Sequence, residues 1–323
     1  MIFRRIELVL FLLLPVCLPV EARLRLPKSN NLTGSSIEMG VGAGWSSLCY
    51  TLADGNNVGA ANFSAHVGYS YFFNRYVGLA VGVDFARYGS SAYYSNALFE
   101  WRNVYDSDGE SYTHRTQLDK WRETQSLYAV CVPVMAQFAI PINRSLQFMA
   151  AVGVEYAHFV SGRYAASGII THSGYYPNWR LTLDEMPPYG FYSTSDFAPS
   201  GKLGNRPFSI NFIANFGLVM PINKRWDLTA KVYFDYGLTK ALDLEESANP
   251  IGFRNDKEGM SLLHGFMNDY TTVLATDQAG TQANVLAVGL EIGVRFKLST
   301  PHRCHCLRAH NSKFKPTKHR RRR

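Results

Sequence analysis

The 323-residue sequence is poor in charge, in cysteine and in long apolar runs. Charged residues make up 18% of the chain, against about a quarter in an average soluble domain. No apolar run after residue 22 reaches the ~18 residues that a transmembrane helix needs, and the mean hydropathy of −0.13 is too low for a helical membrane bundle. Five scattered cysteines make no disulfide framework. These shortages exclude a helical membrane protein and a disulfide-stapled scaffold.

The formal net charge of +8 comes from one end of the chain. Nine of the 33 Lys and Arg residues lie in 299–323, which contains no Asp or Glu. Residues 23–298 are therefore close to neutral. A basic nucleic-acid-binding body is excluded, and no nucleic-acid partner is expected.

Aromatic residues (14%) and glycines (26) are plentiful, as in a chain of strands and turns. In 77–86 bulky apolar residues such as Val81 and Val83 alternate with small or polar ones such as Gly82 and Asp84. At 12 to 16 residues, such segments exceed the ~5–6 of a globular strand and suffice to cross a bilayer, for which about 9–11 are enough. The eight predicted strands are 35–46, 61–73, 75–88, 125–140, 146–160, 207–220, 225–238 and 284–298.

The connections between these segments are of two lengths. Three are tight and contain asparagine, at 73–75, 141–144 and 221–224, where Asn tolerates left-handed backbone. The other four are long: 47–60, 89–124, 161–206 and 239–283. Short turns at one end and long loops at the other are typical of an outer-membrane barrel.

The N-terminus has the layout of a secretory signal peptide. A basic start at Arg4 and Arg5 precedes an apolar core, and Val20 and Ala22 are small residues at the two positions that a signal peptidase reads. The apolar core is too short to be a good membrane anchor. A lipoprotein signal at Cys17 is disfavoured by the large preceding Val16.

These features together resemble the eight-stranded outer-membrane β-barrel family of Gram-negative bacteria, which includes the OmpA-type transmembrane domain and the OmpX and OmpW types. The resemblance covers 35–298, including the closing segment Val288–Leu298, and is a pattern rather than a motif. It implies an all-β, single eight-stranded antiparallel up-and-down transmembrane barrel in the cell outer membrane, with three periplasmic turns and four extracellular loops. Implied partners are outer-membrane lipid, lipopolysaccharide and the barrel-assembly machinery. The peptidoglycan-binding domain usual in OmpA-type chains has no room in the 25 residues after Leu298.

The predicted organisation has four parts. They are a signal peptide (1–22), a short periplasmic segment (23–34), the barrel (35–298) and a basic, disordered tail (299–323). The tail carries a Cys-x-Cys at Cys304 and Cys306, whose spacing matches no standard zinc module, and a terminal arginine run. We expect it to touch anionic surfaces in the periplasm.

A barrel in lipid needs a bulky apolar outer face and a small or polar inner one. Aromatic girdles are predicted at the two interfaces: Phe148, Trp226 and Phe296 near the turns, and Phe85, Tyr156 and Tyr236 above them. Asp84, Glu155 and Asp235 form either an acidic ring that favours cations or, as we expect, internal ion pairs with Lys231, His66 or Arg295. The predicted lumen-facing charged residues are Glu38, Asp84, Glu155, Lys231, Asp235, Glu291 and Arg295.

No cofactor, metal or catalytic residue is predicted. A lipid-modifying hydrolase would need a Ser/His/acid group, but the spacing of His158 and Ser161 puts them on opposite faces of a strand. Residues 106–110 resemble a fragment of a calcium loop without its closing Glu, and a solvated turn is the better interpretation. We expect Cys49 and Cys131 not to pair with the tail cysteines, across an apolar band about 25 Å tall.

The predicted function is non-enzymatic: a structural or surface-interaction barrel whose long loops contact an extracellular ligand. Tryptophans and tyrosines in those loops are equally consistent with binding surfaces and with long hairpins. The alternative is a narrow channel for small polar solutes, since eight strands enclose little more than side chains. A lipid-modifying enzyme is the third hypothesis.

Overall fold

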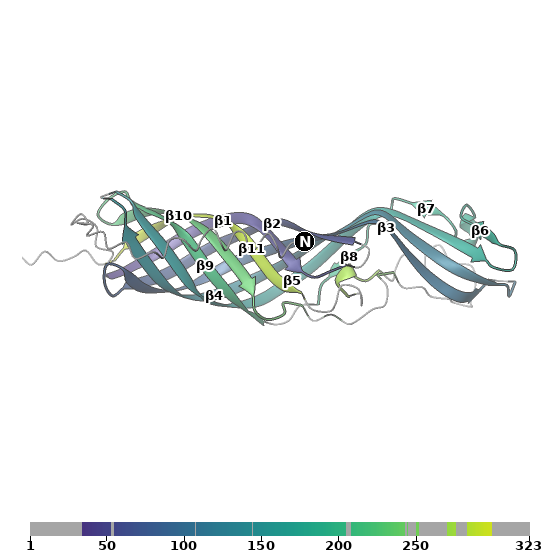
Figure 1. Cartoon of the computed structure of the whole chain (residues 1–323), viewed down its shortest axis with the longest axis horizontal. Coiled ribbons are helices and arrows are strands. Elements are labelled where there is room, and N and C mark those ends of the chain that lie inside the picture. Colours follow the sequence, from purple (N-terminus) through teal and green to yellow (C-terminus); the bar gives the residue numbers. More distant parts are fainter. Residues whose placement is uncertain are drawn as a thin grey trace, which may run out of the picture.

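The computed structural model describes residues 34–52, 55–106, 108–143, 145–204, 208–242, 244, 250–251, 270–275 and 283–298. Eight strands form a closed antiparallel ring in which chain neighbours pair, β5 pairs with β9, and β11 returns to β1 (Figure 1). The predicted eight-stranded barrel is confirmed. Its strands are β1 (Gly34–Cys49), β2 (Gly55–Phe72), β3 (Val77–Tyr105), β4 (Ser111–Pro141), β5 (Gln147–Tyr176), β9 (Phe208–Pro221), β10 (Trp226–Gly237) and β11 (Asn284–Lys297).

The remaining elements are short. Strands β6 (Leu181–Leu183), β7 (Ser193–Thr194) and β8 (Ser200–Lys202) pair with β5, and two 3₁₀ turns occupy Pro187–Tyr189 and Val273–Ala275. In the part of the chain that the structure describes, no helix has the length and apolarity to cross a membrane. The predicted signal peptide and the basic tail lie outside the described residues.

The three tight turns share one side-chain device. The carboxamide oxygens of Asn74, Asn143 and Asn223 accept backbone N–H groups two residues on, each at 2.8 Å. These are Asx turns, in which the side chain replaces a backbone acceptor. Among the described residues, the non-glycine residues with left-handed backbone are Asn103, Lys120 and Arg180, none of which lies in one of the three tight turns. The turns form where we predicted them, but our prediction that their asparagines allow left-handed backbone is wrong.

Three strands continue far beyond the barrel. β3, β4 and β5 have 29, 31 and 30 residues, against 12 to 14 in β9, β10 and β11. Their outer halves, with the following segment that carries β6 and β7, form a sheet that we call the arm, made of residues 95–119 and 169–196 (Figure 1). Much of 89–124 and 161–206 is therefore strand, where the sequence predicted loops.

A β-bulge marks the junction of barrel and arm. Lys120 and Trp121 of β4 lie opposite the single residue Gly168 of β5, and Lys120 has a left-handed φ of 49°. A Cβ at Gly168 would lie 2.7 Å from the Trp121 Cα, so only glycine allows this approach. Bulges bend and twist a strand, and the arm bends away from the barrel axis at this level (Figure 1).

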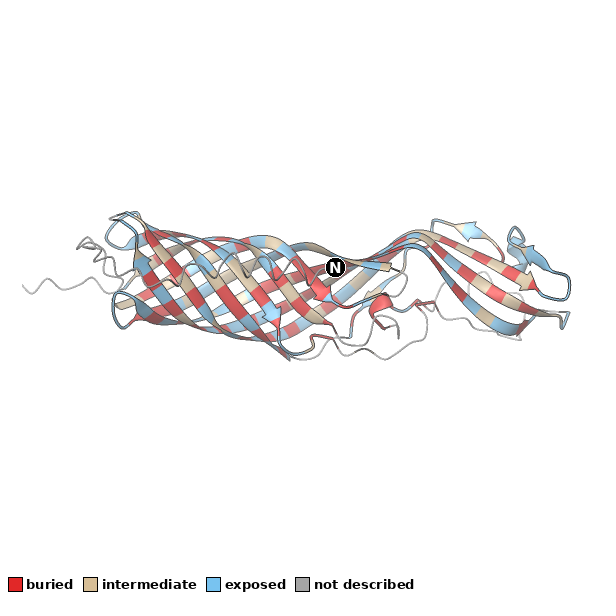
Figure 2. Ribbon diagram, viewed as in Figure 1, coloured by how far each residue is buried: buried red, intermediate tan, exposed pale blue. Residues whose placement is uncertain are grey.

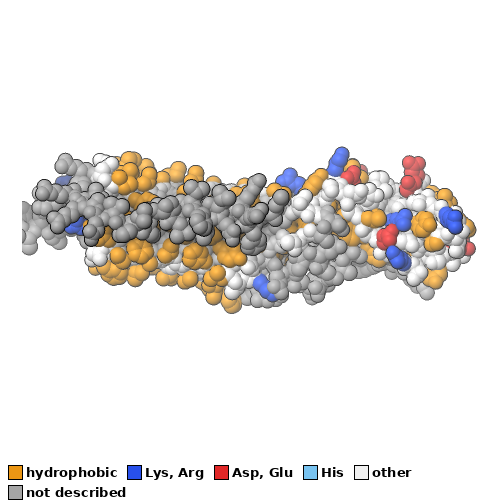
Figure 3. Space-filling view, viewed as in Figure 1, with side chains coloured by type: hydrophobic (Ala, Val, Ile, Leu, Met, Phe, Trp, Pro, Cys, Tyr) orange, Lys and Arg blue, Asp and Glu red, His pale blue; other side chains and the backbone are white. Residues whose placement is uncertain are grey.

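Burial alternates residue by residue around the barrel (Figure 2). The outward side chains are apolar, for example Leu290 (66% exposed), Ile292 and Val134. In Figure 3 hydrophobic side chains cover the visible barrel wall, whereas charged ones appear mainly on the arm. A closed ladder with an apolar exterior satisfies the requirements of a lipid bilayer.

Candidate functional site

The barrel interior contains a compact ion-pair cluster in its half nearest the tight turns. Neighbouring strands place Glu38 opposite Arg295 and Lys231 opposite Glu291. Arg295 Nη2 lies 3.0 Å from Glu38 Oε2, and Lys231 Nζ lies 3.2 Å from Glu291 Oε1 and also contacts Glu38. All four side chains are buried. Glu38 therefore bridges both cations, and the cluster fills the lumen with paired charge.

Glycines make the room that these charged side chains need. A Cβ at Gly40 would lie 2.7 Å from Glu291 Oε1, and one at Gly68 would lie 2.7 Å from the His66 ring. Both distances are shorter than real Cβ contacts, so a larger residue would displace Glu291 or His66. Gly40 and Gly68 thus leave space for polar side chains of the interior.

A second cluster, higher in the barrel, is acidic. Asp84 pairs with His66, Asp235 Oδ2 accepts the Tyr88 hydroxyl at 2.5 Å, and Glu155 Oε1 accepts Asn211 Nδ2 at 3.1 Å. Both Asp235 and Glu155 are buried. Of the three cationic partners that we considered, His66 pairs with this group, whereas Lys231 and Arg295 are bound to the lower cluster.

The space between the two clusters is small. A cavity of about 50 Å³ is lined by the three acids of the upper cluster together with Lys231 and Glu291. That volume holds one or two water molecules. The structure thus places five of the seven predicted lumen residues around the cavity, and Glu38 and Arg295 complete the lower cluster beside it.

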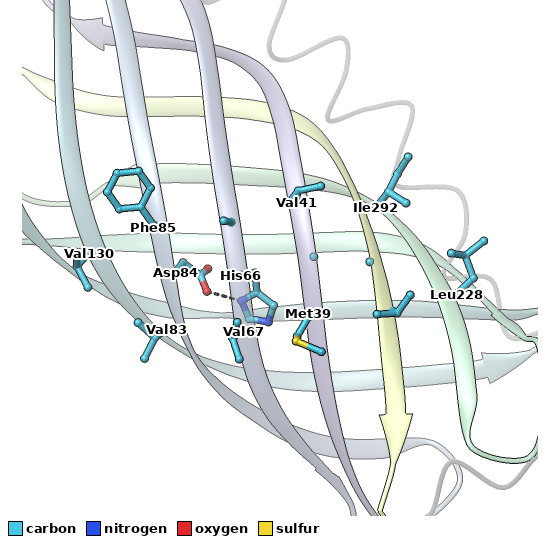
Figure 4. A pocket seen from close by; sticks show the side chains of 14 residues that line it. Met39, Val41, His66, Val67, Val83, Asp84, Phe85, Val130, Leu228 and Ile292 are labelled. Carbon is cyan, nitrogen blue, oxygen red and sulfur yellow. Dashed lines mark hydrogen bonds and ion pairs between the residues drawn. The ribbon is translucent and has the colours of Figure 1, made fainter.

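The strand wall separates this polar interior from an apolar exterior. Figure 4 shows the Asp84–His66 contact and, from the same strands, the side chains of Val83 and Val67, which are 55% and 54% exposed. The hollow drawn there runs along β1, β2, β3 and β11 and is lined mainly by apolar side chains. It belongs to the lipid-facing wall rather than to the lumen.

The predicted girdle residues lie on the outer face. Phe85, Tyr156, Tyr236 and Trp226 are 38–47% exposed, while Phe148 and Phe296 are half-buried. Trp226 and Phe296 pack with ring centroids 4.9 Å apart, and Tyr156 stacks on Phe208 at 5.7 Å. Each pair joins neighbouring strands, as cross-strand aromatic pairs do in sheets.

The arm carries an aromatic column that the sequence did not predict. Tyr112 stacks on Tyr176 at 5.3 Å and meets the Phe191 ring edge-on at 5.7 Å, and Trp179 stacks on Tyr176 at 5.3 Å. The three inner rings are buried, whereas Trp179 is 58% exposed. The column thus connects the arm's core to its tip.

Two histidines lie in the core of the arm beside this column. His114 Nε2 and His172 Nδ1 are 3.4 Å apart, and Thr116 Oγ1 lies 3.0 Å from His172 Nδ1. Burial lowers the pKa of His114 to about 3, with a contribution from His172, and burial lowers the pKa of His172 to about 4. Both imidazoles are therefore neutral at pH 7.

The turn at 106–110 uses its first carboxylate internally. Asp106 Oδ1 accepts the backbone N–H groups of Asp108 (3.0 Å) and Glu110 (2.8 Å), and Oδ2 accepts the Tyr176 hydroxyl at 3.1 Å. Carboxylates are among the oxygen ligands of calcium. Here the geometry is that of a turn anchored to the aromatic column.

The strand faces of His158 and Ser161 differ from expectation. A bulge in β5 pairs His158 with Val130 and Ser161 with Tyr128, which are two residues apart on one face of β4. Both residues therefore lie on the outer face of the wall, and our inference of opposite faces from their odd spacing is wrong. Cys49 and Cys131 are free thiols, exposed and buried respectively, and the tail cysteines lie outside the described residues.

Comparisons with known proteins find similarity of structure only. No family model and no curated protein matches the sequence. Neisserial surface protein A aligns with 82% of this chain and 97% of its own (12% identity, TM-score 0.35). OprG from Pseudomonas aeruginosa covers 82% and 96% (9%, 0.33), and the attachment invasion locus protein Ail of Yersinia pestis covers 82% and 100% (12%, 0.29). These neighbours are eight-stranded outer-membrane barrels, the kind that the sequence resembles. The fold assignment itself rests on the closed ring of strands.

Proposed function

We propose that the chain is a non-enzymatic outer-membrane β-barrel protein of a Gram-negative bacterium that displays the arm at the cell surface to contact an extracellular ligand. The observation that carries the proposal is the continuity of β3, β4 and β5 from the barrel wall into the arm. Residues 1–22 direct export, and the partners in the envelope are outer-membrane lipid, lipopolysaccharide and the assembly machinery.

The surface chemistry supports this orientation. The outward residues of β4 become polar from Ser126 upward, below the start of the arm, and remain polar in the arm at Arg115 and Gln117. Asymmetric barrels of this kind have their short turns in the periplasm and their long connections outside the cell. The arm therefore extends away from the membrane.

The interior favours an interaction role over a channel. The lower cluster blocks the lumen with paired charge, and the open space above it is about 50 Å³. A solute path through it would require separating buried ion pairs, which is strongly unfavourable. We therefore rank the narrow channel second.

The arm has the properties of a recognition element. Continuous ladders anchor it to the barrel, and the aromatic column stiffens its core. Binding to a rigid element avoids the cost of ordering a loop. The exposed Trp179, with Tyr105 (58%) and Tyr189 (48%), offers aromatic side chains of the kind that dominate binding surfaces.

The test is to remove the arm and keep the barrel. Residues 95–120 would be replaced by an Asn-Gly turn and 169–196 by a short Gly-Ser linker, because Tyr94 and Trp121 already face each other in the register. Bacteria displaying either form would be compared for binding to host-cell monolayers and to sulfated and neutral glycans. We expect binding to be lost while the heat-dependent gel shift of a folded barrel remains.

The result that would overturn the proposal is equally concrete. Unchanged binding by the shortened barrel would show that the arm is not the contact surface. Reproducible conductance steps from the intact protein in a planar bilayer would instead favour the channel. A matched control, Trp179→Ala, leaves both ladders intact and tests whether the tip itself makes the contact.

A further inference from the structure

The mouth of the barrel is covered by its own chain. Segments 241–242, 250–251 and 270–275, which we call the cap, belong to the connection between β10 and β11. Val273, Leu274 and Ile251 are no more than 1% exposed and belong to a core shared with wall residues such as Leu48 and Leu127. Figure 1 shows the 273–275 turn, in yellow-green, where the barrel meets the arm. The cap thus packs against the wall at the outer end of the barrel.

One carboxylate of the wall holds this cap. Glu123 of β4 is 0% exposed. Its Oε2 accepts the Tyr270 hydroxyl at 2.7 Å and the Val273 N–H at 3.0 Å, and its Oε1 accepts the Thr272 hydroxyl at 2.5 Å. Gln125 of the wall adds a fourth donor at 2.8 Å. Three of the four donors therefore come from the cap.

The bulge at the base of the arm contributes to the same contact. It turns Trp121 into the mouth, where Nε1 donates to the Tyr270 hydroxyl at 3.1 Å. Tyr164 of β5 donates to the Tyr270 carbonyl at 3.2 Å. Tyr270 is thus held on both its side chain and its backbone by the wall.

A buried carboxylate is an unusual way to close a barrel. Burying a charge or a polar group costs free energy unless hydrogen bonds replace the lost water. The pKa of Glu123 is raised because burial outweighs the hydrogen bonds from Thr272, Gln125 and Tyr270. An apolar side chain here would hold the cap by packing alone. The Glu123 carboxylate instead accepts hydrogen bonds from the cap when the cap is in place, and it would accept them from water if the cap moved away. Its hydrogen-bonding capacity is therefore met with the cap either bound or displaced.

From this geometry we infer that the cap is a removable lid latched by Glu123, and that it controls access from outside the cell to the barrel interior. The ion-pair cluster lies deeper and blocks passage through the barrel, whereas the lid governs entry to the chamber above that cluster. The inference goes beyond display of the arm, and it can fail while the arm still binds its ligand.

The chain contains its own reporter for the lid. Cys131 is 0% exposed and lies on the inner face of β4, at the level of Asp84 and eight residues below Glu123. Cys49, at the end of β1, is exposed. A small thiol reagent added from outside therefore reaches Cys49 freely but reaches Cys131 only after the lid has opened.

The experiment compares the modification rates of these two thiols. Full-length protein with Cys17→Ser, Cys304→Ser and Cys306→Ser would be assembled in vesicles and treated with 2-aminoethyl methanethiosulfonate, with each site quantified by mass spectrometry. In the parent, Cys131 should react far more slowly than Cys49. With Glu123→Ala, Cys131 should react about tenfold to a hundredfold faster, the range expected for losing hydrogen bonds to a charged group, while Cys49 is unchanged.

Two further variants keep the test decisive. Tyr270→Phe combined with Thr272→Val removes two cap donors and leaves Glu123 in place, so it should release Cys131 even if Glu123→Ala fails to assemble. Glu100→Ala removes an exposed carboxylate of the arm and should leave both rates unchanged. If the donor variant assembles, judged by its heat-dependent gel shift, and Cys131 stays protected, the latch is refuted. Equal reactivity of Cys131 and Cys49 in the parent would refute the lid.

Discussion

The barrel and the arm share strands β3, β4 and β5, but the side chains on each face of these strands differ between the two regions. On β4 the outward residues of the barrel are apolar, such as Val132 and Val134, whereas in the arm they are Arg115 and Gln117. The inward residues of β4 are mostly small or polar in the barrel, whereas in the arm they are Tyr112, His114, Thr116 and Leu118, of which Tyr112 belongs to the aromatic column. The same strands thus pass from a region with an apolar outer face into a region with a polar outer face.

The difference shows what decides the side chains of a long strand. Hydrogen bonding is the same along the whole ladder, so it sets no preference between the two regions. In the barrel, lipid demands apolar groups outside, and the closed ring leaves charges to pair inside. In the arm, the outward face is in contact with water, so the stability of the arm must come from hydrophobic burial on its inner face.

Breaking the lower cluster tests the charged interior most strongly. Lys231→Met leaves Glu291 without a cation and Glu38 with Arg295 alone, and losing one partner of a buried pair costs roughly 3–5 kcal/mol. We expect the urea midpoint for unfolding in vesicles, followed by gel mobility, to fall accordingly. Adding Glu291→Leu should recover much of the loss, because it removes the orphaned charge. Equal midpoints for the single and double variants would contradict this account.

The outward faces of the barrel and of the arm can be compared by introducing arginine at one position in each. Arginine near the middle of the lipid costs roughly 2–4 kcal/mol, so Val152→Arg on β5 should impair assembly, seen as loss of the heat-modifiable form. Thr171→Arg lies on the outward face of the same strand in the arm and should assemble normally. Normal assembly of both would mean that the apolar belt does not contact lipid at Val152.

Acid should loosen the arm but not the barrel. An unfolded histidine titrates near 6.5, whereas burial holds the pKa of His114 at about 3 and that of His172 at about 4 in the folded arm. Between those values the unfolded arm binds protons that the folded arm does not. Its stability is therefore complete above about pH 6.5 and is lost as the pH falls toward 4, by about 2 kcal/mol per histidine at pH 5.

Limited proteolysis measures that loss locally, because cleavage reports opening of the arm. Papain should cut residues 95–119 or 169–196 faster at pH 5 than at pH 7, while the barrel stays intact. The matched control, His114→Phe with His172→Phe, keeps the ring packing and removes the titration, so its cleavage should not rise at pH 5. A wild-type arm equally resistant at both pH values would argue against buried neutral histidines.

Much of the barrel could be predicted from the sequence. Alternation with period two located all eight strands, because lipid outside and a narrow lumen inside impose opposite demands on successive residues. The inward charges followed from the same parity. The reason for the turn asparagines was wrong, since their side chains act as acceptors rather than allowing left-handed backbone.

The strands of the arm were not predicted because the alternation of apolar and polar residues is weaker where both faces of a strand are not constrained by lipid and lumen. Residues 112–119 do alternate, with Tyr112, His114, Thr116 and Leu118 inward, but half of these are polar and Lys120 breaks the register with a bulge. Glu123 was not predictable as a latch because its donors come from 270–273, about 150 residues away in sequence. Such long-range pairings leave no local pattern in the sequence.

The smallest effect is expected at the arm's open face. Arg115 Nε lies 2.9 Å from Glu100 Oε1, and its guanidinium lies 4.7 Å from the centre of the Tyr175 ring. Both partners of the ion pair keep about a third of their side-chain surface in water, and exposed pairs contribute about 0.2–1 kcal/mol. Arg115→Ala should therefore raise papain cleavage of the arm only slightly and leave the urea midpoint of the barrel unchanged. A loss as large as that from Lys231→Met would mean that this face is covered, and an arm covered on both faces could not present a surface to a ligand.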